Sequence, residues 1–348
     1  MIRTSNSERI IGGLLAGAMA FAVAGGAIAQ QPARSAGEPT GRQAPVLDGT
    51  VFHAQVLLDR AGFSPGVIDG QEGISFQEAL RGFQQARGLV LTGELDRPTR
   101  QALLRDQTPP IRRLRISEDD ARDSFVGSIP DDPAEKAKME RLGYRNLLEK
   151  IAEKFHTTPE TILALNDPKS ALRAGTVLRL PNVLPASRSY PGAEPEVAQL
   201  LSDLNVDPRQ PEADRIVVDK SDKVVRVFDA EDRLVAQFPA TLGSERDPLP
   251  LGTWKVNSVA YNPSFKYQPR LFWDVPDDRE EHLLPPGPNG PVGVIWIDLD
   301  RENIGIHGTD APETIKRAES HGCVRLTNWD AARLARMVDD GMEVVFQA

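Results

Sequence analysis

The feature of this sequence that most limits its possible folds is the division of the chain into short patterned segments by stretches without a regular apolar period. The chain has 348 residues and contains 28 prolines. This share of about 8% exceeds the usual ~5%. At roughly 100–200 residues per domain, such a chain should hold two or three domains. Two proline-containing stretches, residues 107–143 and 185–213, separate the patterned segments. We therefore predict small domains joined by linkers, the first linker with partial structure.

The N-terminal segment has the three parts of a secretory signal. Arg3 and Arg9 precede an uncharged run that closes with Ala27-Ile28-Ala29. A basic start, an apolar middle and a small-x-small end are typical of a cleaved signal peptide. The uncharged run could also just span a bilayer, but its five glycines make it a poor permanent helix. We predict a signal peptide at residues 1–29, a tether at residues 30–49 and no stable membrane insertion after cleavage.

The charge balance and the cysteine count exclude several classes of function. Lys and Arg number 41 against 50 Asp and Glu, which gives a formal net charge of −9. Because nucleic-acid binding depends on clustered Lys and Arg, we expect no nucleic-acid partner. Cys323 is the only cysteine, which rules out a disulfide framework and a zinc site made of several cysteines. No His, Asp and Glu cluster has metal-ligand spacing, so neither a metal nor an organic cofactor is expected.

The first patterned segment, residues 50–106, predicts three short helices. Phe76, Ala79, Leu80 and Phe83 follow the i, i+3, i+4, i+7 spacing of a helix face. Shorter helical patterns precede and follow them. The segment resembles a peptidoglycan-binding module, and the runs that carry the resemblance are Gly62-Phe63, Val67-Ile68-Asp69-Gly70, Ala79 to Gln84, Gly88-Leu89, Thr92-Gly93 and Thr99 to Leu103. The resemblance implies binding to peptidoglycan, and a simple helical spacer is the alternative.

Residues 144–184 predict a smaller α+β unit. Apolar side chains between Leu147 and Phe155 line one face of a helix, and Thr157 or Thr158 can cap a second helix. A turn and a strand follow. The order resembles a LysM glycan-binding repeat, through the runs Ile151-Ala152, Leu163 to Asn166 and Gly175 to Asn182. No clear strand precedes Leu147, which indicates a degenerate repeat.

The C-terminal segment, residues 214–347, is predicted to be mostly β, with about 135 residues. β-branched and aromatic runs predict strands at 216–219, 224–228, 234–238, 254–256, 294–297 and 343–346. One clear helix begins at Thr327, which forms a capping-box-like start with Asp330. Gly341 ends that helix.

Two short runs in this domain carry reactive side chains. One run contains His307, and the other contains His321 and Cys323. A lone cysteine is most often a small buried apolar side chain, but here two of the five histidines lie close to it in the sequence. The thiolate is the nucleophilic form of cysteine, and a nearby imidazole can take its proton. The residues alone predict acyl transfer through a thioester and leave open which histidine is the base.

These runs resemble the signature of the L,D-transpeptidase catalytic domain, a YkuD-type fold. They read Ile306-His307-Gly308-Thr309 and Ser320-His321-Gly322-Cys323-Val324-Arg325-Leu326. The resemblance implies that Cys323 is the nucleophile and that His307 is its base, oriented by the carbonyl of Gly308. It also implies that the oxyanion hole is lined by His321, Gly322 and Cys323.

The roles of two further residues stay open at this point. Arg325 is expected either to hold a substrate carboxylate or to form a structural salt bridge. Ser320 is expected either to be a hydrogen-bond partner or to be a turn residue.

The expected architecture is multidomain: a mostly-β YkuD-type catalytic domain preceded by a small three-helix module and a small α+β LysM-like module. The resemblance implies peptidoglycan as the partner, both stem peptides and glycan strands, in the periplasm or cell-wall space. Cys323 would release a terminal D-Ala and pass the acyl group to an amine, which gives a 3→3 crosslink or a related exchange. The alternatives are hydrolysis by an L,D-carboxypeptidase and a wall-binding scaffold without turnover.

Overall fold

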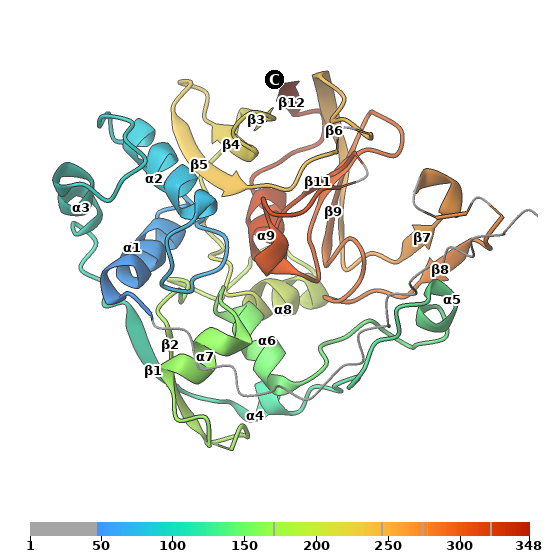
Figure 1. Cartoon of the computed structure of the whole chain (residues 1–348), viewed down its shortest axis with the longest axis horizontal. Helices are drawn as coiled ribbons and strands as arrows, with labels where there is room; N and C mark the ends of the chain where they lie inside the picture. The colour runs from blue at the N-terminus through green and yellow to red at the C-terminus, as the bar shows by residue number, and fades with distance from the viewer. Residues whose placement is uncertain (1–46, 170, 245, 273–274, 277, 321) are drawn as a thin grey trace, which may run out of the picture. The chain divides into compact units, whose positions relative to one another are not determined.

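The computed structural model describes residues 47–348 apart from 170, 245, 273, 274, 277 and 321 (Figure 1). The predicted signal peptide at 1–29 and almost all of the tether at 30–49 lie outside these residues. Within the described ranges, no helix is long and apolar enough to cross a membrane. The described residues belong to one compact unit with several hydrophobic cores, one of which combines side chains of the first module, such as Phe52 and Ile68, with side chains of residues 144–184.

Three helices form the first module, drawn in blue to teal in Figure 1: α1 (Gly49–Arg60), α2 (Ile74–Ala86) and α3 (Arg97–Leu103). Aspartates begin two of them. Asp48 accepts hydrogen bonds from the first amides of α1, and Asp96 accepts one from the first turn of α3, as N-cap side chains do. The predicted apolar face of α2 is buried together with side chains of α1. The prediction of three helices is confirmed.

The second module contains α6 (Leu147–Lys154), α7 (Pro159–Leu165) and β2 (Val177–Pro181), as predicted. Thr158 is the residue that caps α7. A first strand, for which the sequence shows no clear pattern, is nevertheless present, because β1 (Ile111–Arg115) pairs antiparallel with β2.

The strand β1 lies inside residues 107–143, so this stretch is not only a linker. Its sequence is IRRLR, in which the two apolar residues are three apart and do not alternate. A strand of this kind has no period-two signal in the sequence and depends on pairing with β2. The same stretch holds two short helices, α4 (Glu118–Ala121) and α5 (Pro133–Lys136), which agrees with the expected partial structure.

The second predicted linker, residues 185–213, is also wrong in part, because it contains α8 (Pro195–Asp203). Leu201 and Val206 from this stretch are completely buried in the core of the C-terminal domain. The prolines of this stretch indicated a linker, yet Pro195 lies in the first turn of α8. Backbone amides in the first turn have no hydrogen-bond acceptor within the helix, so a proline there costs no hydrogen bond.

An eight-stranded sheet dominates the described part of the C-terminal domain, in the order β11-β10-β9-β6-β12-β3-β4-β5. Its strands are β3 (Arg215–Asp219), β4 (Val224–Phe228), β5 (Leu234–Pro239), β6 (Gly252–Tyr261), β9 (Ile295–Leu299), β10 (Gly305–His307), β11 (Val324–Arg325) and β12 (Glu343–Gln347). The β12–β3 and β10–β11 pairs are parallel, and the other neighbours are antiparallel. The predicted strands are confirmed, whereas β10 and β11 are too short to show a period in the sequence.

Beyond β5 the chain returns to the opposite edge of the sheet. Thr241 and Gly243 form isolated bridges with Arg325 and Ser320. The sheet therefore curls until the continuation of one edge strand meets the other edge. A separate hairpin of β7 (Phe265–Tyr267) and β8 (His282–Leu284) extends from this domain.

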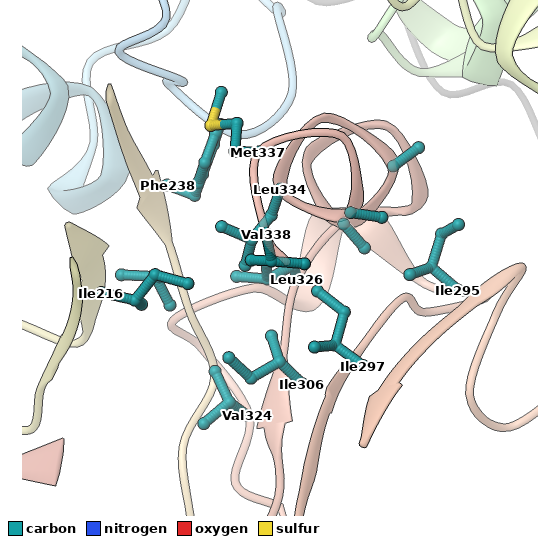
Figure 2. Close-up of a cluster of buried hydrophobic side chains, with 14 of the residues drawn as sticks. Ile216, Phe238, Ile295, Ile297, Ile306, Val324, Leu326, Leu334, Met337 and Val338 are labelled. Carbon is teal, nitrogen blue, oxygen red and sulfur yellow. The ribbon is translucent and has the colours of Figure 1, made fainter. Parts of the chain in front are cut away.

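The helix α9 (Asn328–Ala335) supplies the core on one face of the curled sheet. Thr327 caps it by accepting from the amide of Asp330, as predicted. Figure 2 shows side chains from the α9 region meeting side chains from the strands. The labelled members of this cluster are Ile216, Phe238, Ile295, Ile297, Ile306, Val324, Leu326, Leu334, Met337 and Val338. Burying each such side chain contributes about 1.5–3 kcal/mol, so β10 and β11 are held firmly against α9.

Polar contacts join the modules within this unit. Asp59 of α1 forms a bidentate ion pair with Arg333 of α9, at 3.0 and 2.8 Å, and both side chains are almost fully buried. Ser64 donates to the carboxylate of Asp330 at 2.7 Å. The first module is therefore fixed on the C-terminal domain by charges that are almost completely shielded from water.

Candidate active site

The parallel pairing of β10 and β11 brings the two reactive runs side by side. Ile306 lies opposite Val324, and His307 lies opposite Arg325. Cys323 directly precedes β11, so it lies next to the strand that carries His307. The register continues to place Cys323 level with Gly305, two positions before His307 on the adjacent strand, so residues sixteen positions apart in the sequence become near neighbours.

The segment that carries Cys323 is anchored at both of its ends. Ser320 donates its amide to the carbonyl of Leu242 at 3.1 Å. Arg325 and Thr241 exchange two backbone hydrogen bonds, each of 2.9 Å. Between these anchors the hydroxyl of Ser320 donates to the carbonyl of Cys323 at 2.6 Å. Ser320 is therefore both a hydrogen-bond partner and the residue that closes the turn around the cysteine.

His307 is buried and has a defined tautomer. Its Nδ1 lies 2.7 Å from the carbonyl oxygen of Gly308. A carbonyl only accepts, so Nδ1 carries the hydrogen and Nε2 keeps its lone pair. Burial, assisted by the charge of Arg325, lowers the pKa of His307 to about 3. The ring also stacks on Trp296, with centroids 5.7 Å apart. The imidazole is thus a neutral base with a fixed orientation.

The thiol of Cys323 is also neutral in the free protein. Burial raises its pKa, while a backbone hydrogen bond from Gly305 and the charge of Arg325 act in the opposite direction. Its Sγ lies 3.6 Å from the carbonyl oxygen of Asn303. Since both groups are neutral, the two side chains at rest are a thiol and an imidazole.

Two glycines of the site are required for different reasons. Gly322 has a φ of +99°, which a residue with a Cβ rarely adopts. At Gly308 the reason is space, because an added Cβ would lie 2.0 Å from Oδ1 of Asn328.

Arg325 lies beside the pair, largely buried, and its Nε has no hydrogen-bond partner among the described residues. Its charge lowers the pKa of both His307 and Cys323. His321, the remaining predicted site residue, lies outside the described residues.

Sequence reasoning did not single out Trp296, which stacks on His307, Asn328, which packs on Gly308, or Glu153, which accepts a hydrogen bond from Asn328. Asn328 lies between the two predicted capping residues, where an asparagine needs no special explanation. Glu153 lies in another module. Nothing in the local sequence of these residues could have indicated their place. Within the described ranges, no three His, Cys, Asp or Glu side chains are grouped so as to hold a metal ion.

Comparison with protein families assigns each module. Residues 213–346 match the family model of the L,D-transpeptidase catalytic domain. The C-terminal domain is therefore similar to the L,D-transpeptidase catalytic domain. Residues 48–103 match a peptidoglycan binding domain, and residues 146–181 match a LysM domain. The three predicted resemblances and the multidomain fold class are therefore confirmed.

Individual proteins that resemble this chain also carry the name L,D-transpeptidase. A protein from Bacillus licheniformis named L,D-transpeptidase YkuD is 27% identical over 197 residues, which are 57% of this chain and 91% of that protein. A protein of the same name from Bacillus subtilis is 44% identical over 57 residues, 16% of this chain and 35% of that protein. The solved structure of an L,D-transpeptidase from Mycobacterium smegmatis is 22% identical, covering 39% of this chain and 59% of that chain. Its TM-score of 0.32 is too low to add to the assignment.

Proposed function

We propose that this protein is an exported cysteine transpeptidase that acts on the stem peptides of peptidoglycan. The observation that carries the proposal is the hydrogen bond from Nδ1 of His307 to the carbonyl of Gly308. It leaves Nε2 free to take the proton of Cys323, the thiol that precedes the adjacent strand. The L,D-transpeptidase catalytic domain is the matching enzyme class.

In the first half-reaction, Sγ of Cys323 attacks the carbonyl carbon of the third stem residue while its proton passes to Nε2 of His307. The tetrahedral oxyanion is held by backbone amides around Gly322 and Cys323, an arrangement in which each donor is worth about 3–4 kcal/mol. The C–N bond to the terminal D-Ala then breaks. The departing amine takes the proton from His307, and a thioester remains on Cys323.

In the second half-reaction, an amine on another stem attacks the thioester carbonyl and gives its proton to His307. The C–S bond breaks, and Cys323 regains the proton. The products are a new amide crosslink and the starting enzyme. A D-amino acid, a lysine of a lipoprotein or water can replace the acceptor amine in the same scheme.

The two smaller modules support peptidoglycan as the substrate. Peptidoglycan binding and LysM domains occur beside the catalytic domain in one unit. Peptidoglycan lies outside the cytoplasmic membrane, so we propose a location in the periplasm or cell-wall space, reached by means of the signal peptide.

Covalent labelling tests the proposal directly. A carbapenem should add its full mass to the intact protein, and Cys323→Ala should abolish this adduct while the circular dichroism spectrum stays unchanged. Labelling that persists in Cys323→Ala would refute the assignment of the nucleophile. A wild-type protein that binds sacculi but forms no adduct would favour a scaffold without turnover.

Mass analysis of muropeptides after incubation with sacculi distinguishes the transpeptidase from an L,D-carboxypeptidase. We expect crosslinked dimers whose formation requires Cys323. Tripeptides without dimers would identify water as the acceptor and would support the hydrolase instead.

A further inference from the structure

The buried side chain of Asn328 packs against the backbone of Gly308, the residue that follows His307. Its Oδ1 accepts from the amide of Val294 at 3.1 Å. Its Nδ2 donates to Glu153 Oε1 at 2.6 Å and to the carbonyl of Pro288 at 3.2 Å. Both amide hydrogens and the oxygen of Asn328 are therefore committed, and the carboxamide has one orientation.

This carboxamide packs against two glycines, Gly293 and Gly308. A Cβ added at Gly293 would lie 1.9 Å from Oδ1 of Asn328, and one added at Gly308 would lie 2.0 Å from it. The oxygen thus packs directly on the Cα of Gly308. The carbonyl of that same glycine accepts the hydrogen of His307 Nδ1. Any movement of Asn328 would change the space in which the Gly308 peptide is held.

The residue that fixes Asn328 comes from the LysM module. Glu153 lies on α6 and is only 8% exposed. Burial raises the pKa of Glu153 to about 7, while hydrogen bonds from Tyr144 and Asn328 act to lower it. Glu149 and Asp310 also face this carboxyl group and raise its pKa. Because Tyr144 and Asn328 both donate hydrogen bonds to this buried carboxyl group, its position is fixed.

We propose that Glu153 and Asn328 are positioning residues for the catalytic base. Glu153 of the LysM module orients the carboxamide of Asn328, which holds the Gly308 peptide and thereby the ring of His307. The LysM module is then a structural part of the active site. The inference rests on the proposed function, since it assigns His307 the role of base.

Acylation by a carbapenem separates positioning from binding. In Glu153→Ala and Asn328→Ala, the maximal rate of acylation at saturating carbapenem should fall about ten- to hundredfold, because a small misplacement of a catalytic group has effects of this size. The half-saturating concentration should stay unchanged. Glu153→Gln keeps an oxygen that accepts a hydrogen bond from Asn328, so this variant should be acylated at the wild-type rate.

A matched control is Glu160→Ala, which removes an exposed carboxylate from α7 of the same module. It should leave both kinetic parameters unchanged. Wild-type acylation rates in folded Glu153→Ala and Asn328→Ala would overturn the inference and leave the proposed function intact.

A second measurement does not depend on activity. Two-bond ¹H–¹⁵N spectra of the imidazole rings report the tautomer, with the signals of His307 assigned by comparison with His307→Gln. The wild type should show hydrogen on Nδ1, and Asn328→Ala should show a mixture of tautomers, with Asn328→Ser as the substitute if the alanine variant does not fold. An unchanged Nδ1–H tautomer in the folded variant would overturn the inference. Absence of acylation in the wild type, with the expected spectra, would refute the proposed function alone.

Discussion

Two buried histidines, His156 and His307, have contrasting hydrogen bonds. At the junction of the modules, Nδ1 of His156 lies 3.0 and 3.1 Å from the carboxylate oxygens of Asp59, and Nε2 lies 2.8 Å from the carbonyl of Leu204. In the active site, Nδ1 of His307 lies 2.7 Å from the carbonyl of Gly308. Its Nε2 has no hydrogen-bond partner among the residues that the structure describes.

The difference explains why only one of these rings can serve as a base. Both nitrogens of His156 lie within hydrogen-bond distance of oxygen atoms, so neither nitrogen is available to a nucleophile. Both histidines stack on a tryptophan, His156 on Trp329 at 5.1 Å and His307 on Trp296 at 5.7 Å. Burial and stacking are therefore shared, and the free Nε2 distinguishes the proposed base, His307, from the structural histidine, His156.

The largest expected effect comes from exchanging each ring for glutamine. His307→Gln should lower the second-order rate of carbapenem acylation by about 10²–10⁴-fold, because the general base is lost. Its melting temperature should stay close to that of the wild type. His156→Gln should lower the free energy of unfolding by about 1–3 kcal/mol through lost buried hydrogen bonds, with a normal acylation rate per folded molecule. An equal loss of acylation in both variants would contradict the distinction between His307 as the base and His156 as a structural residue.

The next effect concerns the ion pair that faces His156. Asp59→Ala removes the bidentate partner of the buried Arg333 and leaves only the longer contact with Asp330 at 3.5 Å, so the free energy of unfolding in urea should fall by about 3–5 kcal/mol. Glu118→Ala removes an exposed ion pair with Arg122 and should leave the urea midpoint unchanged. An equal effect of the two substitutions would contradict a structural role for the buried pair.

The same carboxylate gives a pH dependence of stability. Burial alone would raise the pKa of Asp59, but Arg333 and His156 hold it well below its usual range. A lowered pKa of a carboxyl group stabilises the fold above the unfolded value of about 3.9, and this contribution is lost as the pH falls further. Urea midpoints should therefore drop more steeply below about pH 4 in the wild type than in Asp59→Ala. Parallel curves would contradict the assigned pKa shift.

The pH dependence of acylation tests the neutral pair. With the pKa of His307 lowered to about 3 and that of Cys323 raised, both groups are neutral from about pH 5 to 8. The acylation rate should not fall as the pH decreases through about 6.5, the usual pKa of histidine. In Arg325→Gln the pKa of His307 should rise, although burial, the larger cause of its lowering, remains; on the acid side the rate should therefore begin to fall at a higher pH than in the wild type. A wild-type acylation rate that halves as the pH falls to about 6.5 would show that His307 has the usual pKa of a histidine.

The smallest effect is expected from the stacked tryptophan of the active site. Trp296 is half-buried and donates its indole hydrogen to Asp298 at 3.2 Å. Trp296→Leu should reduce the acylation rate by about two- to tenfold, since an aromatic contact of this kind contributes about 0.5–1.5 kcal/mol. A loss as large as that in His307→Gln would show that stacking, and not the free nitrogen, controls the reactivity of the ring.

The reactive pair was predictable from the sequence because both residues lie in short, distinctive runs of one domain. The helices and longer strands were predictable from apolar spacing and caps such as Thr158 and Thr327. The supporting residues were not. Glu153 lies 175 positions from Asn328, and Asp59 lies 274 positions from Arg333. Such contacts depend on how modules pack, which no local pattern expresses.

The two histidines illustrate the same limit. Nothing in the sequence around His156 distinguishes it from a ligand or a base, because its second partner is the carbonyl of Leu204, 48 positions away. The strand β1 was missed for a related reason. Its arginines face solvent, and its partner strand β2 begins more than sixty positions later in the sequence.

The position of β12 in the sheet has a consequence for how the domain assembles. Among the described residues of the eight-stranded sheet, β12 alone joins strands β3 to β5 to strands β6, β9, β10 and β11, apart from the bridges at Thr241 and Gly243. Of all these strands, β12 comes last in the sequence. In a chain that emerges from its N-terminal side, the edges of β3 and β6 stay unpaired until Glu343–Gln347 arrives. Sheet closure is then a late, non-local event, and the two open edges would be the aggregation-prone surfaces of the incomplete chain.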